Sequence, residues 1–180
     1  MARRPHDLPD QPPVYVASPL GFTEPGKEYN VSVIAALTEH GIKPKDPWAM
    51  PNNPIRAALE IPASPERLAA LQRANAEVGR YNEGLIRDSV AMLALLDGTD
   101  VDSGTAAEIG FAAALEIPVV GLRTDTRVTG DNDGAAVNLQ VERFIYRSGG
   151  TITSSLSDAI AALLAVIRSR RVTPGTDAQQ

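Results

Sequence analysis

Short apolar runs alternate with longer amphipathic segments along most of the chain. The apolar runs are typical of strands buried in a parallel sheet, whereas the segments between them have the period of helices. The predicted strands cover residues 14–17, 42–45, 90–96, 117–122 and, more weakly, 144–146. The predicted helices cover residues 27–39, 65–88, 105–116 and 156–168. This alternation predicts an α/β fold: a doubly wound, mainly parallel five-stranded sheet flanked by helices, a flavodoxin-like or Rossmann-like sandwich.

The chain has 180 residues, which suits one domain with a single core. We assign that domain to residues 14–171. Residues 1–13 are charged and rich in proline, and residues 172–180 are polar, so both ends are expected to be flexible tails. Residues 46–63 are rich in proline and asparagine and are predicted to form a long loop, which in a compact domain often has a functional role.

Charge and composition exclude several classes of function. The 17 Lys and Arg residues against 22 Asp and Glu residues give a net charge of −5, which argues against a nucleic-acid-binding protein. There is no cysteine, and the two histidines, His6 and His40, are well separated, so no metal site is expected. No apolar run approaches the roughly 20 residues of a membrane span. Because no export signal follows Arg3 and Arg4, a cytoplasmic location is expected.

The segment from Asp97 to Gly110 contains the strongest candidate chemistry. It leads from a buried strand into a helix, which is where α/β sheets bind ligands. Thr105 and Glu108 have the spacing of a capping box, in which the hydroxyl and the carboxylate satisfy free amides at a helix start. Alternatively, Glu108 lies in the first helical turn, where the helix dipole keeps its carboxylate ionised and suited to act as a nucleophile or base. The local pattern leaves both interpretations open.

Residues 21–28 match most of a phosphate-binding loop but depart from it at decisive positions. Glu28 stands where magnesium binding needs Ser or Thr, and Pro25 removes a backbone donor. We therefore interpret the segment as the start of a helix with Thr23 as its N-cap.

Three further residues have both structural and functional interpretations. Tyr15 lies in the first predicted strand and is expected to be a half-buried aromatic residue whose hydroxyl reaches the surface. Trp48 is either a core residue or a flat platform for a heteroaromatic ring. Asn82 is either a solvated helix position or a residue that hydrogen-bonds a ligand.

Four pieces of the chain, in order, resemble the nucleoside 2-deoxyribosyltransferase family over roughly residues 14–165. They are Tyr15-Val16-Ala17-Ser18-Pro19, Asp97-Gly98, Asp102-Ser103-Gly104-Thr105-x-x-Glu108-x-Gly110 and Val137-Asn138-Leu139. The third piece is the specific one. The resemblance implies that Glu108 is the nucleophile that attacks the anomeric carbon. It also implies that Tyr15 orients Glu108 by a hydrogen bond and that Asp102 holds deoxyribose hydroxyls.

The same resemblance implies further contacts. Asn138 is similar to the family's asparagine that reaches the sugar in a neighbouring subunit's site, which implies a homo-oligomer. Ser18 and Gly104, from the matching pieces, are candidate substrate-binding residues. Asn82 stands where many members have an Asp that handles the base's proton, and Gln140 stands where many have Met. Because a neutral amide is no general acid, Asn82 is expected to hydrogen-bond the base, while water or the base's own tautomerism supplies the proton.

The proline- and asparagine-rich segment adds three candidate base contacts, Asp46, Trp48 and Asn53. Transfer rather than hydrolysis requires the reacting sugar to be shielded from water until the second base arrives. We expect this segment to provide that shielding.

The function that the resemblance implies is exchange of the base of a 2′-deoxynucleoside, in the setting of nucleoside salvage. Glu108 forms a deoxyribosyl ester as one base leaves, and a second, free base attacks that ester, as in retaining glycosidases. Neither a metal nor an organic cofactor is implied. Two other hypotheses remain open. One is a nucleoside or nucleotide N-glycoside hydrolase on the same scaffold, and the other is a non-catalytic nucleoside-binding module in which Glu108 only caps its helix.

Overall fold

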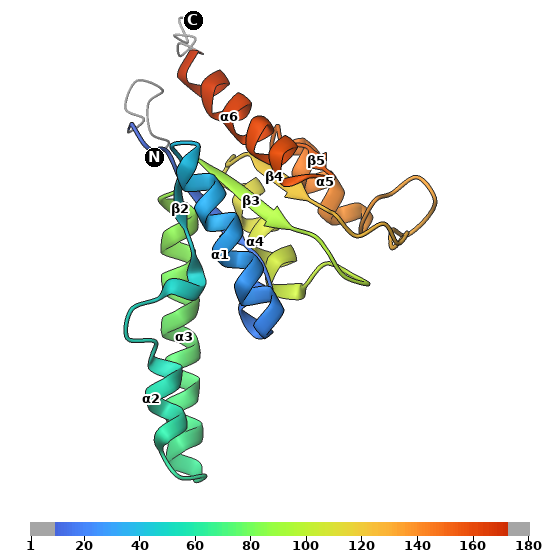
Figure 1. Cartoon of the computed structure of the whole chain (residues 1–180). Helices are drawn as coiled ribbons and strands as arrows, with labels where there is room; N and C mark the ends of the chain where they lie inside the picture. Colours follow the sequence, from blue (N-terminus) through green and yellow to red (C-terminus); the bar gives the residue numbers. More distant parts are fainter. Residues whose placement is uncertain (1–9, 173–180) are drawn as a thin grey trace, which may run out of the picture.

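A five-stranded sheet forms the centre of the molecule, with helices on both faces (Figure 1). The computed structural model describes residues 10–172, so the predicted tails at 1–9 and 173–180 lie outside the described residues. All strands are parallel, in the order β2-β1-β3-β4-β5, which confirms the predicted α/β sheet. The strands are β1 (Pro13–Ala17), β2 (Lys43–Lys45), β3 (Ala91–Leu95), β4 (Val119–Leu122) and β5 (Ile152–Thr153).

The helices are α1 (Glu24–Glu39), α2 (Pro54–Glu60), α3 (Pro65–Arg87), α4 (Ser103–Ala114), α5 (Leu139–Arg147) and α6 (Leu156–Val172). Side chains start two of them as predicted: Thr23 accepts a hydrogen bond from the Gly26 amide at the start of α1, and Ser64 accepts one from the Arg67 amide at the start of α3. Within residues 10–172, none of the helices is both long enough and apolar enough to cross a membrane.

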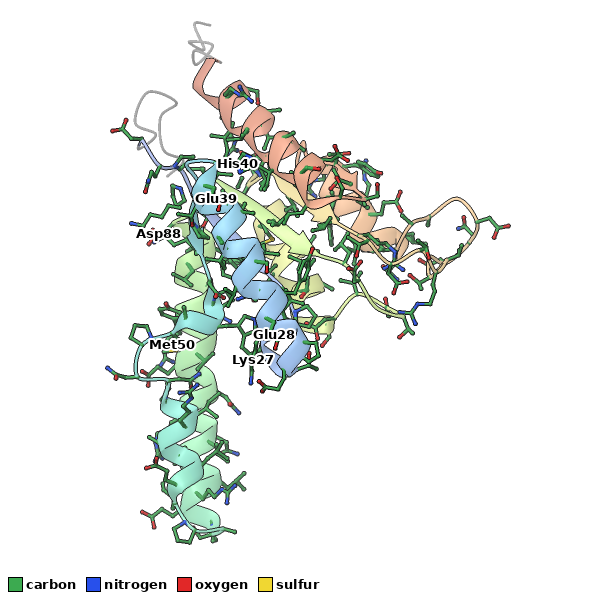
Figure 2. The ribbon with its side chains drawn as sticks, viewed as in Figure 1. Lys27, Glu28, Glu39, His40, Met50 and Asp88 are labelled. Atoms are coloured by element: carbon green, nitrogen blue, oxygen red, sulfur yellow. The ribbon has the colours of Figure 1, made fainter. Side chains whose placement is uncertain are left out.

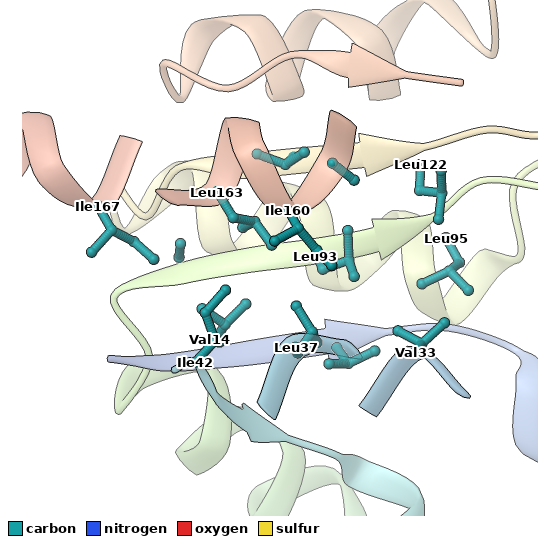
Figure 3. Packing of buried hydrophobic residues seen from close by; sticks show 14 of the residues in the cluster. Val14, Val33, Leu37, Ile42, Leu93, Leu95, Leu122, Ile160, Leu163 and Ile167 are labelled. Atoms are coloured by element: carbon teal, nitrogen blue, oxygen red, sulfur yellow. The ribbon is translucent and has the colours of Figure 1, made fainter. Parts of the chain in front are cut away.

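Each face of the sheet has its own core, because successive side chains along a strand point in opposite directions. Val14 and Val16 of β1 pack with α1 and α6, on the face drawn in Figure 3. Tyr15 and Ala17 point the other way, toward α3, α4 and α5. Strands β1 and β3 are therefore buried along their whole length, which explains why their sequences are almost continuously apolar.

The order of the strands defines where a ligand site belongs. From β1 the chain passes through α1 to β2 on one side, whereas from β3 it passes through α4 to β4 on the other side. In open α/β sheets, ligands bind at the carboxyl ends of the strands where the direction of winding reverses. We therefore expect the site at the carboxyl edge of β1 and β3.

The prediction of a long loop over residues 46–63 is wrong. The segment contains a short 3₁₀ turn, Pro47–Ala49, and helix α2, which lies along α3 in a hairpin that extends beyond the sheet (Figure 1). Each of these elements begins with a proline that directly follows a capping residue, Asp46 or Asn53. Proline suits the first helical position because its φ is already helical and its missing N–H has no helical partner. The prolines that suggested a loop therefore mark helix starts.

The predicted strand at residues 144–146 is also wrong, because these residues belong to α5. Val141 and Ile145, four positions apart, are the buried residues of this helix, so the apolar positions follow a helical period. The fifth strand lies further along the chain and consists of only two residues, Ile152 and Thr153. A strand this short gives no alternating pattern that a sequence can reveal.

Two glycines allow a direct test of this packing. An added Cβ at Gly79, inside α3, meets no atom within 4 Å, whereas at Gly150 it overlaps the backbone oxygen of Val119. We expect Gly79→Ala to raise the free energy of unfolding by about 0.5–1 kcal/mol, since alanine is the better helix former. We expect Gly150→Ala to lower it by about 1–3 kcal/mol, since the backbone must shift. Urea unfolding measures both, and equal effects of the two variants would contradict the structure.

Candidate active site

The carboxyl edge of β1 and β3 brings together segments that are far apart in the sequence. Ser18 directly follows β1, and Asp97 lies just beyond β3. Helix α1 begins near this edge and runs away from it, so that Lys27 and Glu28 lie at its start and Glu39 and His40 at its opposite end (Figure 2).

A hydrogen bond between Tyr15 and Glu108 joins β1 to α4 at this edge. The Tyr15 hydroxyl donates to Glu108 Oε1 over 2.6 Å. Tyr15 is fully buried, so the prediction of a half-buried ring with a surface hydroxyl is wrong. The ring lies on the face that α3 and α4 cover, and its hydroxyl reaches a carboxylate instead of water. Within residues 10–172, Glu108 Oε2 takes part in no hydrogen bond and is the oxygen available to a ligand.

Helix α4 begins two residues earlier than predicted, which changes the interpretation of Glu108. Asp102 is the N-cap, and its Oδ2 accepts a hydrogen bond from the Thr105 amide over 3.0 Å. The proposed capping box of Thr105 and Glu108 is therefore wrong. Glu108 lies in the second turn of α4, beyond the first turn in which the helix dipole acts most strongly on a carboxylate.

Burial raises the pKa of Glu108 to about 7, which the Tyr15 hydrogen bond opposes and the nearby charge of Asp102 increases. Burial and the charge of Glu108 raise the pKa of Tyr15 well above its ordinary value, so its hydroxyl remains a donor. At neutral pH, Glu108 is thus a mixture of acid and carboxylate. The prediction that the helix dipole keeps Glu108 ionised is wrong, because burial dominates.

Asp46 organises a second group of polar side chains at the same edge. Its Oδ1 accepts a hydrogen bond from the Trp48 amide and its Oδ2 accepts one from Asn30 Nδ2, each over 2.9 Å. Trp48 in turn donates from Nε1 to the Ser18 backbone oxygen over 3.0 Å. The charge of Asp46 contributes to the raised pKa of Tyr15, so this group lies close to the Tyr15–Glu108 pair.

Trp48 is partly exposed and is not a core residue. Its side chain is 40% exposed, and its ring meets Phe22 edge to face with centroids 4.7 Å apart. It also lies directly against Gly21, where an added Cβ would overlap the indole ring. The interpretation of Trp48 as a core residue is therefore wrong, and its role as a platform for a base stays a prediction.

Three buried side-chain atoms have no hydrogen-bond partner among residues 10–172: Ser18 Oγ, Asn30 Oδ1 and Asn82 Oδ1. Such atoms are few in folded proteins, and each one needs an explanation. Ser18 and Asn82 are predicted site residues, whereas Asn30 is not. Asn82 follows Tyr81 in α3, and Tyr81 contributes to the raised pKa of Tyr15, so this part of α3 faces the same edge.

The remaining predicted residues have local roles in the described chain. Asn138 caps α5 by accepting from the amides of the following turn, and Asn53 caps α2 in the same way. Gly104 lies in the first turn of α4, where a Cβ would crowd the capping carboxylate. Among the described residues, no hydrogen bond joins Asn53 or Asn138 to the Tyr15–Glu108 pair.

Sequence reasoning missed a junction that ties together the segments following β3 and β4. Arg123 is buried, and its guanidinium donates to the backbone oxygen of Leu96 and to Thr129 Oγ1. In the opposite direction, Asp97 accepts hydrogen bonds from the amide and hydroxyl of Thr124. An arginine directly after an apolar strand is the only signal of this junction in the sequence.

An open pocket of about 600 Å³ lies beside this junction, between the ends of β4 and β5 and the start of α6. Its polar lining includes Arg123, Asp125, Arg127 and Asp158. None of the predicted site residues lines it. In residues 10–172, no cluster of three His, Asp or Glu side chains is placed to hold a metal ion.

The fold and the partly buried carboxylate of Glu108 at the carboxyl edge define a parallel α/β protein with a candidate site for nucleophilic chemistry. The chain belongs to the nucleoside 2-deoxyribosyltransferase family, whose model matches residues 14–142. The members of this family are glycosyl-transferring enzymes that act on nucleosides and nucleobases. Among curated proteins, none matches the chain.

The solved structures that are similar to this one include three that cover most of the chain. A conserved protein from Enterococcus faecalis V583 is 26% identical in sequence, with a TM-score of 0.62. The match covers 89% of this chain and 99% of the Enterococcus chain. A 2-deoxyribosyltransferase from Bacillus psychrosaccharolyticus is 18% identical in sequence, with a TM-score of 0.58. The match covers 86% of this chain and 95% of the Bacillus chain. A CMP N-glycosidase from Clostridium botulinum is 17% identical in sequence, with a TM-score of 0.47. The match covers 85% of this chain and 98% of the Clostridium chain.

The raised pKa of Glu108 predicts a dependence of stability on pH. The ordinary pKa of a glutamate is 4.5 and the pKa of Glu108 in the folded protein is about 7, so between these pH values the folded protein binds more protons than the unfolded chain. Ionised Glu108 therefore lowers the free energy of unfolding above pH 7. Glu108→Gln keeps an oxygen for Tyr15 without the charge, and we expect it to be more stable than the wild type by about 1–3 kcal/mol near pH 8.

This advantage is expected to shrink as the pH falls toward 5, where Glu108 is neutral in the folded protein. Urea unfolding at several pH values measures it. Glu77→Gln, at an exposed position of α3, is the matched control and is expected to give no comparable change. Equal stability of Glu108→Gln and the wild type near pH 8 would contradict the burial of a charged Glu108.

Proposed function

We propose that the chain is a nucleoside 2-deoxyribosyltransferase that exchanges the base of a 2′-deoxynucleoside through a deoxyribosyl ester on Glu108. The observation that carries the proposal is the Tyr15–Glu108 hydrogen bond, which fixes one carboxylate oxygen and leaves the other without a protein partner among residues 10–172. A fixed carboxylate with one accessible oxygen suits attack on an anomeric carbon.

In the first step, Glu108 Oε2 forms a bond to the anomeric carbon while the bond from that carbon to the base nitrogen breaks. The bonding electrons leave with the base, and the transition state has oxocarbenium character. In the second step, a nitrogen of the incoming base attacks the same carbon, the ester bond to Glu108 breaks, and the proton displaced from the base passes to water. Each step inverts the anomeric centre, so the product keeps the configuration of the donor, and Glu108 is returned as a carboxylate.

Tyr15 and Asp102 have supporting roles in this mechanism. Tyr15 holds Glu108 Oε1, so that Oε2 is aimed by a residue whose hydroxyl cannot itself ionise near neutral pH. Asp102 uses Oδ2 to cap α4, and we assign its other oxygen to the deoxyribose hydroxyls. Because ionised Asp102 raises the pKa of Glu108, a sugar hydroxyl that donates to Asp102 weakens this repulsion.

Asn82 contacts the base but does not protonate it. A neutral amide has no acidic proton to give, so the leaving base takes its proton from water, at whichever ring nitrogen its tautomerism makes basic. The unpartnered Asn82 Oδ1 then accepts a hydrogen bond from the base. Both purines and pyrimidines fit this assignment.

Trp48 and Asn138 complete the proposed site. Trp48 lies over the Ser18 backbone as a partly exposed ring on which a base stacks. The Asn138 oxygen is used by its own helix, which leaves its amide nitrogen to donate to the sugar in a neighbouring subunit of a homo-oligomer. Together these contacts exclude water from the ester until the second base arrives.

Base exchange is tested with deoxycytidine or deoxyinosine as donor and free adenine as acceptor. We expect deoxyadenosine to form with the wild type, and Glu108→Ala to reduce its formation by at least about 1,000-fold, because the nucleophile is lost. Chromatography of the products measures the exchange. Glu77→Ala, which removes an exposed glutamate of α3, is expected to leave the rate unchanged.

Two outcomes contradict the proposal. Free base that is released equally with and without an acceptor identifies an N-glycoside hydrolase. Binding of the nucleoside with no turnover in either reaction identifies a non-catalytic binding module.

The pH dependence of exchange tests the role of Tyr15. Attack needs ionised Glu108, so kcat/KM should fall below pH 7, approaching about tenfold per pH unit. The Tyr15 hydrogen bond lowers the pKa of Glu108, so in Tyr15→Phe the fall of kcat/KM on the acidic side should begin at higher pH. The same pH dependence of kcat/KM in Tyr15→Phe and the wild type would show that the hydrogen bond does not control the ionisation of Glu108.

A further inference from the structure

Asn30 is a buried amide whose orientation is fixed by one neighbour and whose oxygen has no partner. It is only 8% exposed, and its Nδ2 donates to Asp46 Oδ2 over 2.9 Å. Only the nitrogen of an amide can donate to a carboxylate, so this hydrogen bond determines which way the amide faces. Asn30 Oδ1 is therefore a defined acceptor, and it has no hydrogen-bond partner among residues 10–172.

The position of Asn30 in α1 is one at which packing favours an apolar residue. Asn30, Val33 and Leu37 are the buried residues of this helix, and their spacing places them on one face. Val33 and Leu37 belong to the hydrophobic core, whereas Asn30 lies one turn nearer the carboxyl edge of the sheet. A polar residue on the core-facing side, with an unpartnered acceptor, is destabilising unless a ligand completes it.

The surroundings of Asn30 connect it to the candidate active site. Its partner Asp46 lies close enough to Tyr15 to raise the pKa of that residue, and Tyr15 holds Glu108. The two other buried atoms without partners in the described chain are on Ser18, which directly follows β1, and on Asn82, which is next to Tyr81 in α3. Both are atoms that can accept hydrogen bonds.

We infer that Asn30 determines base specificity by accepting a hydrogen bond from an exocyclic amino group of the nucleobase, as in adenine or cytosine. The inference rests on the proposed function in that the ligand is a nucleobase. An amino group carries two N–H donors and can satisfy Asn30 Oδ1 together with a second acceptor at this edge. An oxo group at the same position of the base would place one oxygen against another and would be disfavoured.

Asp46 is a positioning residue in this assignment. Its two carboxylate oxygens are engaged by Trp48 and Asn30, so it fixes the ring that stacks on the base and the amide that reads the base edge. Among the described residues, no hydrogen bond fixes the orientation of the Asn82 amide. This amide can present either oxygen or nitrogen by a half-turn, which suits it to bases of either kind.

The experiment compares two bases that differ only in the amino group, adenine and unsubstituted purine. Calorimetry gives the dissociation constants of both for the wild type, Asn30→Ala and Asn75→Ala, an exposed asparagine of α3 that serves as the control. We expect the wild type and Asn75→Ala to prefer adenine. We expect Asn30→Ala to bind adenine roughly two- to tenfold more weakly, with purine affinity changed less than about twofold. Where Asn30→Ala fails to bind purine, Asn30→Ser provides the comparison.

The same variants are assayed as catalysts with the two bases as acceptors. An equal loss for adenine and purine in both Asn30 variants overturns the inference, because it shows that Asn30 only supports the fold. Absence of a preference for adenine in the wild type, or of binding to either base, also overturns it. If the wild type exchanges no bases but Asn30→Ala selectively weakens adenine binding, the proposed function fails and the assignment of Asn30 stands.

Discussion

The hydrogen bond between Tyr15 and Glu108 is the interaction on which the site depends. It joins residues 93 positions apart and exists only because β1 and the start of α4 meet at the carboxyl edge of the sheet. Tyr15 lies on the face that α3 and α4 cover because it alternates with Val14 and Val16, which fill the opposite core. A shift of one residue in the register of β1 would turn its side chain to the other face and leave Glu108 without a partner.

The chemistry at this edge works against the stability of the fold. The partial burial of Glu108 and the nearby charge of Asp102 disfavour its ionised form, and three buried polar atoms lack partners within residues 10–172. Packing elsewhere compensates, because both faces of the sheet are covered by apolar cores. Proteins commonly concentrate such unfavourable features where a ligand completes them. The coincidence of all these features at one edge supports the location of the site independently of family membership.

Much of this arrangement could be predicted from the sequence. The alternation of apolar runs and amphipathic segments was sufficient for the first four strands of the parallel sheet, and the resemblance was sufficient for the pairing of Tyr15 with Glu108. The start of α4 was not predictable from spacing alone, because Asp102 and Thr105 are both good capping residues and only the structure shows which is used. Asn30 was missed for a different reason. Its environment depends on the contact between α1 and the segment after β2, and no local sequence pattern predicts that contact. The junction at Arg123 likewise depends on loops from two different strands.

In the proposed mechanism, Glu108 carries the sugar between two bases. The most direct test is intact-mass and peptide mass spectrometry of the protein, quenched in acid shortly after mixing with a 2′-deoxynucleoside in the absence of any acceptor base. We expect a mass increase equal to one deoxyribosyl group, located on the peptide that contains Glu108 and absent from Glu108→Gln. Turnover without any such adduct, or an adduct on a different residue, would contradict it.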